Sequence, residues 1–246
     1  MSHLKIEHIE KSYGERSVLK DVSFSVQEGE FVSLLGPSGS GKSTLFRIIG
    51  GMTAPLSGAV YLEGEDITGK RGSISYTPQS PSLMPWRTTL QNVLLGQEIV
   101  GKKDEEKARD MLERAGLKGY EQAYPHELSG GMKQRASFIR SILSPQSLIL
   151  LDEPFSALDE FTRLDMQQWL LSIWSEYKRS ILFVTHNIEE AIFLSDRIIV
   201  LSDRPATVVK EFNIPFDRPR REDLLLTEEF LHWKKLIYQE MRVLNE

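Results

Sequence analysis

Gly36-Pro37-Ser38-Gly39-Ser40-Gly41-Lys42-Ser43-Thr44 is the stretch that decides the fold of this 246-residue chain. It fits the phosphate-binding pattern G-x-x-x-x-G-K-[ST], and it follows the apolar run Phe31–Leu35, which predicts a buried strand. The residues after it, Lys42–Ile49, are predicted to form a helix that ends at the Gly50-Gly51 pair. A strand, a glycine-rich loop and a helix in this order predict a nucleotide site.

Each part of this phosphate loop, residues 36–44, has a predicted contact with nucleotide phosphates. Glycines let backbone N–H groups turn towards phosphate oxygens, and the positive end of the following helix adds a favourable dipole. Lys42 supplies a positive charge to the β- and γ-phosphates, and the Ser43 hydroxyl is a ligand for Mg²⁺. The predicted binding residues of the loop are Gly36, Pro37, Ser38, Gly39, Ser40, Gly41, Lys42, Ser43 and Thr44.

A second apolar run, residues 148–151, ends in the acidic pair Asp152-Glu153. Ligands of open α/β sheets bind at the carboxyl ends of the strands, so we expect this pair beside the phosphate loop. Asp152 is placed to hold Mg²⁺ through water, and Glu153 is placed to polarise the water that attacks the phosphate. Two acids after a strand are more often a solvated loop, but a phosphate loop in the same chain favours the functional interpretation.

The apolar pattern elsewhere predicts an α/β fold. Between about residues 88 and 143 the pattern is helical, and after Ser147 strands and helices alternate, which predicts a parallel sheet covered by helices. Phe230, Trp233, Ile237, Met241 and Leu244 lie on one face of a closing helix. Further predicted strands are residues 4–9, 18–26, 60–62, 73–77, 181–184 and 198–201, and further predicted helices are residues 104–115, 132–142, 160–177 and 188–194.

Composition limits the classes of function. A net charge of −5 and a pI near 5.7 argue against nucleic acid as a partner, because nucleic-acid binding normally needs a basic surface. The absence of cysteine excludes disulfides and thiolate metal sites. The N-terminus has no stretch like a signal peptide, and the apolar runs are far shorter than the roughly 20 residues that span a bilayer. If the protein works at a membrane, another chain is expected to span it.

The segment Leu128-Ser129-Gly130-Gly131-Met132-Lys133-Gln134-Arg135 stands between the phosphate loop and the acidic pair. These three motifs in this order resemble the ATP-binding-cassette (ABC) ATPases, and the resemblance covers nearly the whole chain. It implies ATP and Mg²⁺ as cofactors and an α/β P-loop NTPase core with a mixed β-sheet, an antiparallel β subdomain and an inserted α-helical subdomain. We expect the core in residues 1–80 and 145–215, the helical subdomain in 81–144, and a C-terminal helical extension in 216–246.

The resemblance also implies roles for three single residues. Tyr13, before Gly14, resembles the aromatic residue that stacks on adenine, although a tyrosine before glycine is often only turn packing. Gln79 resembles the glutamine that reaches Mg²⁺ and the attacking water. His186, in Thr185-His186-Asn187, resembles the switch histidine that contacts the γ-phosphate. No departure from the family's hydrolytic residues is visible, so we expect an active ATPase.

Two segments resemble family motifs that act across a dimer. Ser129, Gly130 and Gly131 resemble the signature that binds the γ-phosphate held by the other subunit, because N–H groups and a hydroxyl at a helix start form an anion site. The alternative is a loop before a helix. Ser156-Ala157-Leu158-Asp159 resembles the loop that crosses the dimer interface. We expect a homodimer around two ATP molecules, because the phosphate loop and the signature are not expected to serve the same nucleotide within one compact chain.

The segment Ser82-Leu83-Met84-Pro85-Trp86-Arg87-Thr88-Thr89-Leu90-Gln91-Asn92-Val93 indicates a subgroup. It resembles ATPases of importers for nitrate, taurine and alkanesulfonates, as do Pro205, Pro215 and Pro219-Arg220. An apolar segment with a tryptophan fits a groove that receives a helix of a membrane subunit, and the alternative is packing within the helical subdomain.

The implied partners are transmembrane permease subunits and, indirectly, an extracytoplasmic solute-binding protein, with the chain peripheral on the cytoplasmic face of the membrane. Two alternatives remain open: an exporter cassette, and a soluble ABC-type ATPase acting on nucleic acid or ribosomes. The acidic net charge, the single cassette and the Pro-Trp segment weigh against both.

Overall fold

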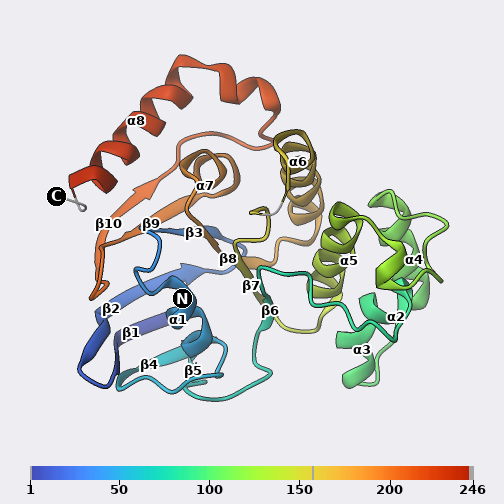
Figure 1. The fold of residues 1–246 in the computed structure, drawn as a ribbon, viewed down its shortest axis with the longest axis horizontal. Coiled ribbons are helices and arrows are strands. Elements are labelled where there is room, and N and C mark those ends of the chain that lie inside the picture. The colour runs from blue at the N-terminus through green and yellow to red at the C-terminus, as the bar shows by residue number, and fades with distance from the viewer. Residues whose placement is uncertain (1, 157, 244–246) are drawn as a thin grey trace.

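A mixed sheet of six strands forms the centre of the computed structural model, which describes residues 2–156 and 158–243 (Figure 1). The strand order is β10-β9-β3-β8-β7-β6, and all neighbours are parallel except β10, which runs antiparallel to β9. The expected mixed sheet is therefore confirmed. The strands are β3 (Phe31–Leu35), β6 (Ser75–Thr77), β7 (Leu148–Asp152), β8 (Ser180–Thr185), β9 (Arg197–Leu201) and β10 (Val208–Asn213).

The three central strands are buried along their whole length because both faces of the sheet are covered. Every residue of β3, β7 and β8 is buried. On one face the rings of Phe31 and Phe183 meet edge to face, with their centroids 6.0 Å apart. The one polar side chain of β3, Ser33, shares a hydrogen bond with Ser195, so it is satisfied inside the core.

A second, antiparallel sheet with the order β2-β1-β4-β5 packs beside the first. Alternate residues of β1, such as Leu4 and Ile6, are buried, as expected for a sheet with one solvated face. One apolar cluster joins this sheet to helix α1 (Lys42–Ile49) and to one face of the central sheet. The strands are β1 (Ser2–Tyr13), β2 (Arg16–Gln27), β4 (Ser57–Leu62) and β5 (Glu65–Asp66).

Helices cover the other face of the central sheet and also form an arm at one side of the molecule (Figure 1). The covering helices are α6 (Glu160–Tyr177), α7 (Ile188–Leu194) and α8 (Glu228–Val243), with the 3₁₀ turn η2 (Glu222–Leu226) before α8. The arm consists of α2 (Thr89–Val93), α3 (Leu95–Ile99), α4 (Glu105–Arg114), the 3₁₀ turn η1 (Pro125–Glu127) and α5 (Gly130–Leu143). None of the helices in the described ranges is long and apolar enough to cross a membrane.

Some boundaries differ from the sequence predictions for identifiable reasons. Strand β10 was not predicted, because it is an edge strand whose Lys210 and Glu211 are exposed, and charged edges hide the alternating pattern. Helix α5 begins at Gly130 rather than at Met132, because the preceding Ser129 caps it despite the low helix propensity of glycine. On α8, Phe230 and Ile237 are buried as predicted, whereas Leu244 lies outside the described residues.

Pro85 and Trp86 lie on the surface of the arm, whereas Leu83 packs against the core and residues 88–90 are buried. Trp86 is 71% exposed, so the alternative in which it is a core residue is wrong. The segment is nevertheless ordered, because the buried Asn92 side chain accepts from the Met84 N–H at 2.7 Å and donates to the Met84 and Arg87 carbonyls. The arm therefore presents an exposed indole, on a backbone segment that Asn92 holds, close in sequence to Gln79.

Candidate functional site

The phosphate loop makes a tight connection between β3 and α1. Gly41 has φ +121°, and a Cβ there would lie 3.0 Å from the side chains of Val18 and Leu19, so glycine is required. Gly41 is also the N-cap of α1, with no side-chain capping bond, which leaves the first N–H groups of the helix available to an anion. The loop thus has the backbone form that phosphate binding needs.

Lys42 closes this loop from inside. Its Nζ donates to the carbonyls of Gly36 and Pro37, both at 2.8 Å, and the residue is 5% exposed. Burial lowers the pKa of this amine, while the nearby charges of Glu153 and Asp152 act in the opposite direction. The cation is therefore held in place before any phosphate arrives.

Asp152 and Glu153 follow at the carboxyl end of β7. Asp152 is 8% exposed and accepts a hydrogen bond from the Tyr76 hydroxyl at 3.1 Å. Burial raises the pKa of Asp152, with the Tyr76 hydrogen bond acting against it. Tyr76 was missed by the sequence analysis, since a tyrosine inside a predicted strand carries no sign of its partner.

The turn at Glu153 brings its side chain to His186. Glu153 has φ +44°, and its N–H donates to the Val184 carbonyl at 3.0 Å. Its Oε2 lies 3.2 Å from Nδ1 of His186, which follows β8. The Glu153 side chain is 24% exposed and that of His186 is 56% exposed, so both are accessible to a ligand.

Gln79 is joined to the same turn. Its Nε2 donates to Oγ of Ser156 at 3.0 Å, and that hydroxyl donates to the Glu153 carbonyl at 2.9 Å. The chain after β6 and the chain after β7 are thereby connected through Ser156. In the neighbouring segment, residues 156–159, Asp159 caps α6 by accepting from the Thr162 N–H at 3.0 Å, whereas Ala157 lies outside the described residues.

A cleft of about 580 Å³ lies between α1, the chain after β6, the chain after β7 and the start of α5. Its lining contains Ser43, Gln79, Asp152 and Gly130. Ser43 of the phosphate loop and Gly130 at the start of α5 thus both line this cleft. Two buried polar atoms at these motifs, Oγ of Ser40 and Nε2 of Gln134, have no hydrogen-bond partner. Gln134 also lines the cleft, and such a donor favours a polar ligand there.

The residues of the cleft fit Mg²⁺ that arrives with a nucleotide. A Ser43 hydroxyl, an Asp152 carboxylate and a Gln79 amide are the hard oxygen ligands that Mg²⁺ prefers. In the part of the chain that the structure describes, no three His, Cys, Asp or Glu side chains could hold a metal by themselves. Mg²⁺ usually binds through one or two carboxylates together with substrate phosphates, so a partial set of protein ligands is what it requires.

The remaining predicted residues flank the cleft. Ser129 is the N-cap of α5, and its Oγ accepts from the Met132 N–H at 3.3 Å, with Gly130 and Gly131 as the first helical residues. Tyr13 lies outside the lining of the cleft and is 51% exposed. It belongs to the β1–β2 hairpin, whose Val18 packs against Gly41 of the phosphate loop, and Nζ of Lys11 lies 5.3 Å from the centroid of its ring.

Comparison with known proteins gives concordant matches. The family described as "ABC transporter" matches residues 19–156. The formylaminopyrimidine import ATP-binding protein ThiZ of Halalkalibacterium halodurans is 41% identical over 98% of this chain and 95% of its own length. The nitrate import ATP-binding protein NrtD of Synechocystis is 42% identical over 87% of this chain and 84% of its own. The solved ATP-binding cassette MJ0796, dimeric and bound to ADP and Pi, has a TM-score of 0.73 at 31% identity, over 87% of this chain and 100% of that one.

The buried carboxylate of Asp152 predicts a gain in stability when it is removed. Because its pKa is higher in the folded than in the unfolded chain, the group favours folding below its unfolded pKa and opposes it as the pH rises through the folded pKa. Asp152→Asn, without nucleotide or metal, should therefore melt above the wild type at pH 7. The difference should shrink as the pH falls towards 4, measured by thermal unfolding.

Asp66→Asn is the matched control of opposite sign. Hydrogen bonds from Thr68 lower the pKa of the exposed Asp66, so this carboxylate stabilises the fold at neutral pH and loses that effect on acidification. Its amide variant should melt below the wild type at pH 7. An Asp152→Asn protein that melts lower than the wild type at pH 7 would contradict the prediction.

Proposed function

The chain belongs to the ABC transporter family of ATPases, and on this premise we propose that it drives an importer of a small solute. As a member of that family it binds ATP with Mg²⁺ and hydrolyses it. The observation that carries the proposed site is the 3.2 Å contact between Glu153 and His186, beside a cleft that Ser43 and Asp152 line. We also propose the division of the chain into a core (residues 1–80 and 145–215), a helical arm (81–144) and a C-terminal extension (216–246).

The proposed roles follow from these positions. Lys42 and the N–H groups that begin α1 bind the β- and γ-phosphates, and Tyr13 stacks on the adenine. Ser43, Gln79 and Asp152 would hold Mg²⁺, which when bound neutralises the negative charge that develops on the phosphate oxygens. Glu153 accepts a hydrogen bond from the attacking water and orients it. His186, held by Glu153, contacts the γ-phosphate from the end of the adjacent strand.

The nucleotide is proposed to be shared between two copies of the chain. The dimeric form of the related cassette MJ0796 supports this arrangement. In it, Lys42 of one copy and Ser129, Gly130 and Gly131 of the other bind the same ATP. The presence of Gly130 in the cleft of its own chain supports a competing arrangement, in which one chain supplies both motifs.

The importer assignment rests on the relatives and on the exposed Pro-Trp segment. ThiZ and NrtD are named for import of a formylaminopyrimidine and of nitrate, which supports import over export and over action on nucleic acid or ribosomes. We propose that Trp86 contacts a transmembrane permease at the cytoplasmic face of the membrane, with an extracytoplasmic solute-binding protein delivering a solute of the nitrate, sulfonate or taurine kind. The relatives are named for different solutes, which supports the proposal that those partners select the solute.

Glu153→Gln should abolish turnover while ATP binding persists. The amide cannot accept a proton or orient water as the carboxylate does, so kcat should fall by about 10²- to 10⁴-fold. The expected companion result is an ATP-stabilised dimer, detected by size-exclusion chromatography with Mg²⁺ and ATP. Glu160→Gln, at the start of α6, is the control and should keep wild-type activity. Near-normal turnover in Glu153→Gln would show that another residue orients the water.

Complementation tests the shared nucleotide. Lys42→Ala and Ser129→Arg chains should each be inactive, and purified heterodimers should regain ATPase activity because one composite site is intact. If a single chain supplied both motifs, neither chain of the mixture would hold a complete site and no activity would return. Verified heterodimers without activity would therefore contradict the shared site, unless heterodimers of a wild-type chain and a Lys42→Ala chain, which also hold one intact site, prove inactive as well. That result would show that two intact sites are needed.

Trp86→Ala should weaken assembly without weakening the fold. Buried aromatic anchors at interfaces are often worth about 2 kcal/mol, so the affinity for the permease should fall about 30-fold, which co-purification would detect. The melting temperature should stay close to that of the wild type, since the indole is 71% exposed. Trp174→Ala is the contrasting variant: this indole is 7% exposed and meets Phe31 edge to face, so its removal should cost about 3–5 kcal/mol. Normal assembly and transport in Trp86→Ala would reject the coupling role.

A further inference from the structure

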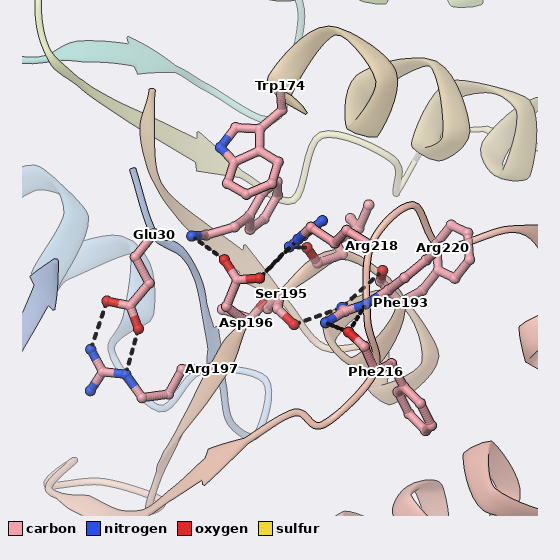
Figure 2. Close-up of polar contacts among 12 residues, drawn as sticks. Glu30, Trp174, Phe193, Ser195, Asp196, Arg197, Phe216, Arg218 and Arg220 are labelled. Carbon is pink, nitrogen blue, oxygen red and sulfur yellow. Dashed lines mark hydrogen bonds and ion pairs between the residues drawn. The ribbon is translucent and has the colours of Figure 1, made fainter. Parts of the chain in front are cut away.

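The chain between β10 and η2 inserts two arginines under the end of helix α7 (Figure 2). Arg220 is 6% exposed, and its Nη1 donates to the carbonyls of Ile192, Phe193 and Ser195 at 2.8, 3.2 and 2.7 Å. Its Nε and Nη2 donate to the Phe216 carbonyl at 3.1 and 2.9 Å. All three nitrogen atoms of this guanidinium are therefore bonded to main-chain oxygens.

Arg218 completes the same set of contacts. Its Nη2 donates to the Leu194 carbonyl at 2.7 Å, and the guanidinium pairs with Asp196. Its Cζ lies 4.1 Å from the centroid of the Trp174 ring. The carbonyls at the end of a helix have no partners within the helix and carry partial negative charge, so the two arginines satisfy four successive carbonyls, residues 192–195.

Burial of the Arg220 guanidinium has a desolvation cost. Desolvation lowers the pKa of Arg220 to about 10, with the charge of Arg218 as a further cause. No carboxylate is bonded to Arg220 in the contacts of the described residues, and its donors are used on carbonyls alone. An apolar side chain would avoid the cost of burying the charge but would leave the carbonyls at the end of α7 without these partners, so the arginine fixes where the end of the helix lies.

The opposite end of α7 is also held, and it borders the site. Asn187 caps the helix by accepting from the N–H groups of Glu189 and Glu190. The Thr185 hydroxyl donates to Glu190 at 2.6 Å, and Lys234 of α8 pairs with Glu189. His186 stands directly before the cap, so its backbone position depends on where α7 lies.

We propose that Arg220 and Arg218 are positioning residues for ATP hydrolysis: they hold α7 so that His186 stays against Glu153. The inference rests on the proposed role of His186 in the site. It adds to that role by assigning a function to the C-terminal extension, which anchors α7 at one end through the two arginines and at the other through Lys234. Displacement of the extension should loosen the histidine without affecting the phosphate loop.

The test compares kinetics and a histidine signal in matched variants of the full chain. Arg220→Gln should lower kcat about tenfold and leave KM for ATP within about twofold, because misplacing a group that acts only on the reacting phosphate lowers turnover rather than binding. Arg220→Lys, which keeps the charge and one donor, should recover part of the loss. In nucleotide-free protein with ¹³C-labelled histidine, the ring signal of His186, assigned by its loss in His186→Gln, should shift or broaden in Arg220→Gln while that of His126 stays in place.

Arg197→Gln is the control for general destabilisation. Its guanidinium is 13% exposed and binds Glu30, Glu211 and the Ser25 carbonyl, away from α7 (Figure 2). It should lower the melting temperature while kcat and the His186 signal stay at wild-type values. Arg218→Gln replaces Arg220→Gln if the latter does not purify, with the same expected results.

The outcomes separate the inference from the proposed site. One outcome overturns the positioning role alone. In it His186→Gln is inactive, whereas Arg220→Gln keeps wild-type kcat and an unmoved His186 signal. Equal loss of kcat in Arg220→Gln and Arg197→Gln also overturns it, since the loss then reflects stability. Wild-type turnover in His186→Gln overturns the role of the histidine in the site and the positioning role with it.

Discussion

Parallel pairing of β3, β8 and β7 is the constraint on which the site depends. In the observed register Leu35 pairs with Thr185 and Asp152 pairs with Val184, so the three strands end at one edge of the sheet. The residues that follow are the phosphate loop, the acidic pair and the switch histidine. A one-residue shift between β7 and β8 would turn alternate side chains to the other face of the sheet, and Glu153 would then no longer meet His186. Burial of the strands fixes their register, and the register in turn places the residues of the site.

Several polar and charged groups at this edge of the sheet are buried at a cost in stability. Lys42 is buried among carbonyls, the pKa of Asp152 is raised by burial, and Nε2 of Gln134 has no partner. Each of these three features lowers the stability of the protein without a ligand. The groups are already in position, so little rearrangement of the protein is needed when a polar ligand binds. The two arginines beneath α7 extend this pattern beyond the cleft, because they too bury charge to fix a backbone position.

Short-range signals let the sequence predict much of this structure. The phosphate loop, its strand and its helix were predicted with the observed bounds for α1, and α7 was predicted at the observed residues Ile188–Leu194. Contacts that depend on distant pairing could not be predicted. Tyr76 reaches Asp152 only because β6 pairs with β7, and Arg220 reaches the end of α7 only because the chain returns beneath it. Residues 219 and 220 were noted in the sequence as a subgroup feature, but nothing in the sequence indicates which carbonyls the arginine meets.

The pairing of β3 with β8 also governs how the chain can fold during synthesis. Phe31 pairs with Ile181, 150 residues later in the chain. At a translation rate of about 5–20 residues per second, the apolar strand waits roughly 10–30 s for its partner. Within that time the β1–β2 hairpin and then the helical arm can form, because their contacts are local. The nascent chain therefore exposes an unpaired apolar strand for many seconds, which makes early binding by a chaperone advantageous to a protein whose finished sheet has that strand at its centre.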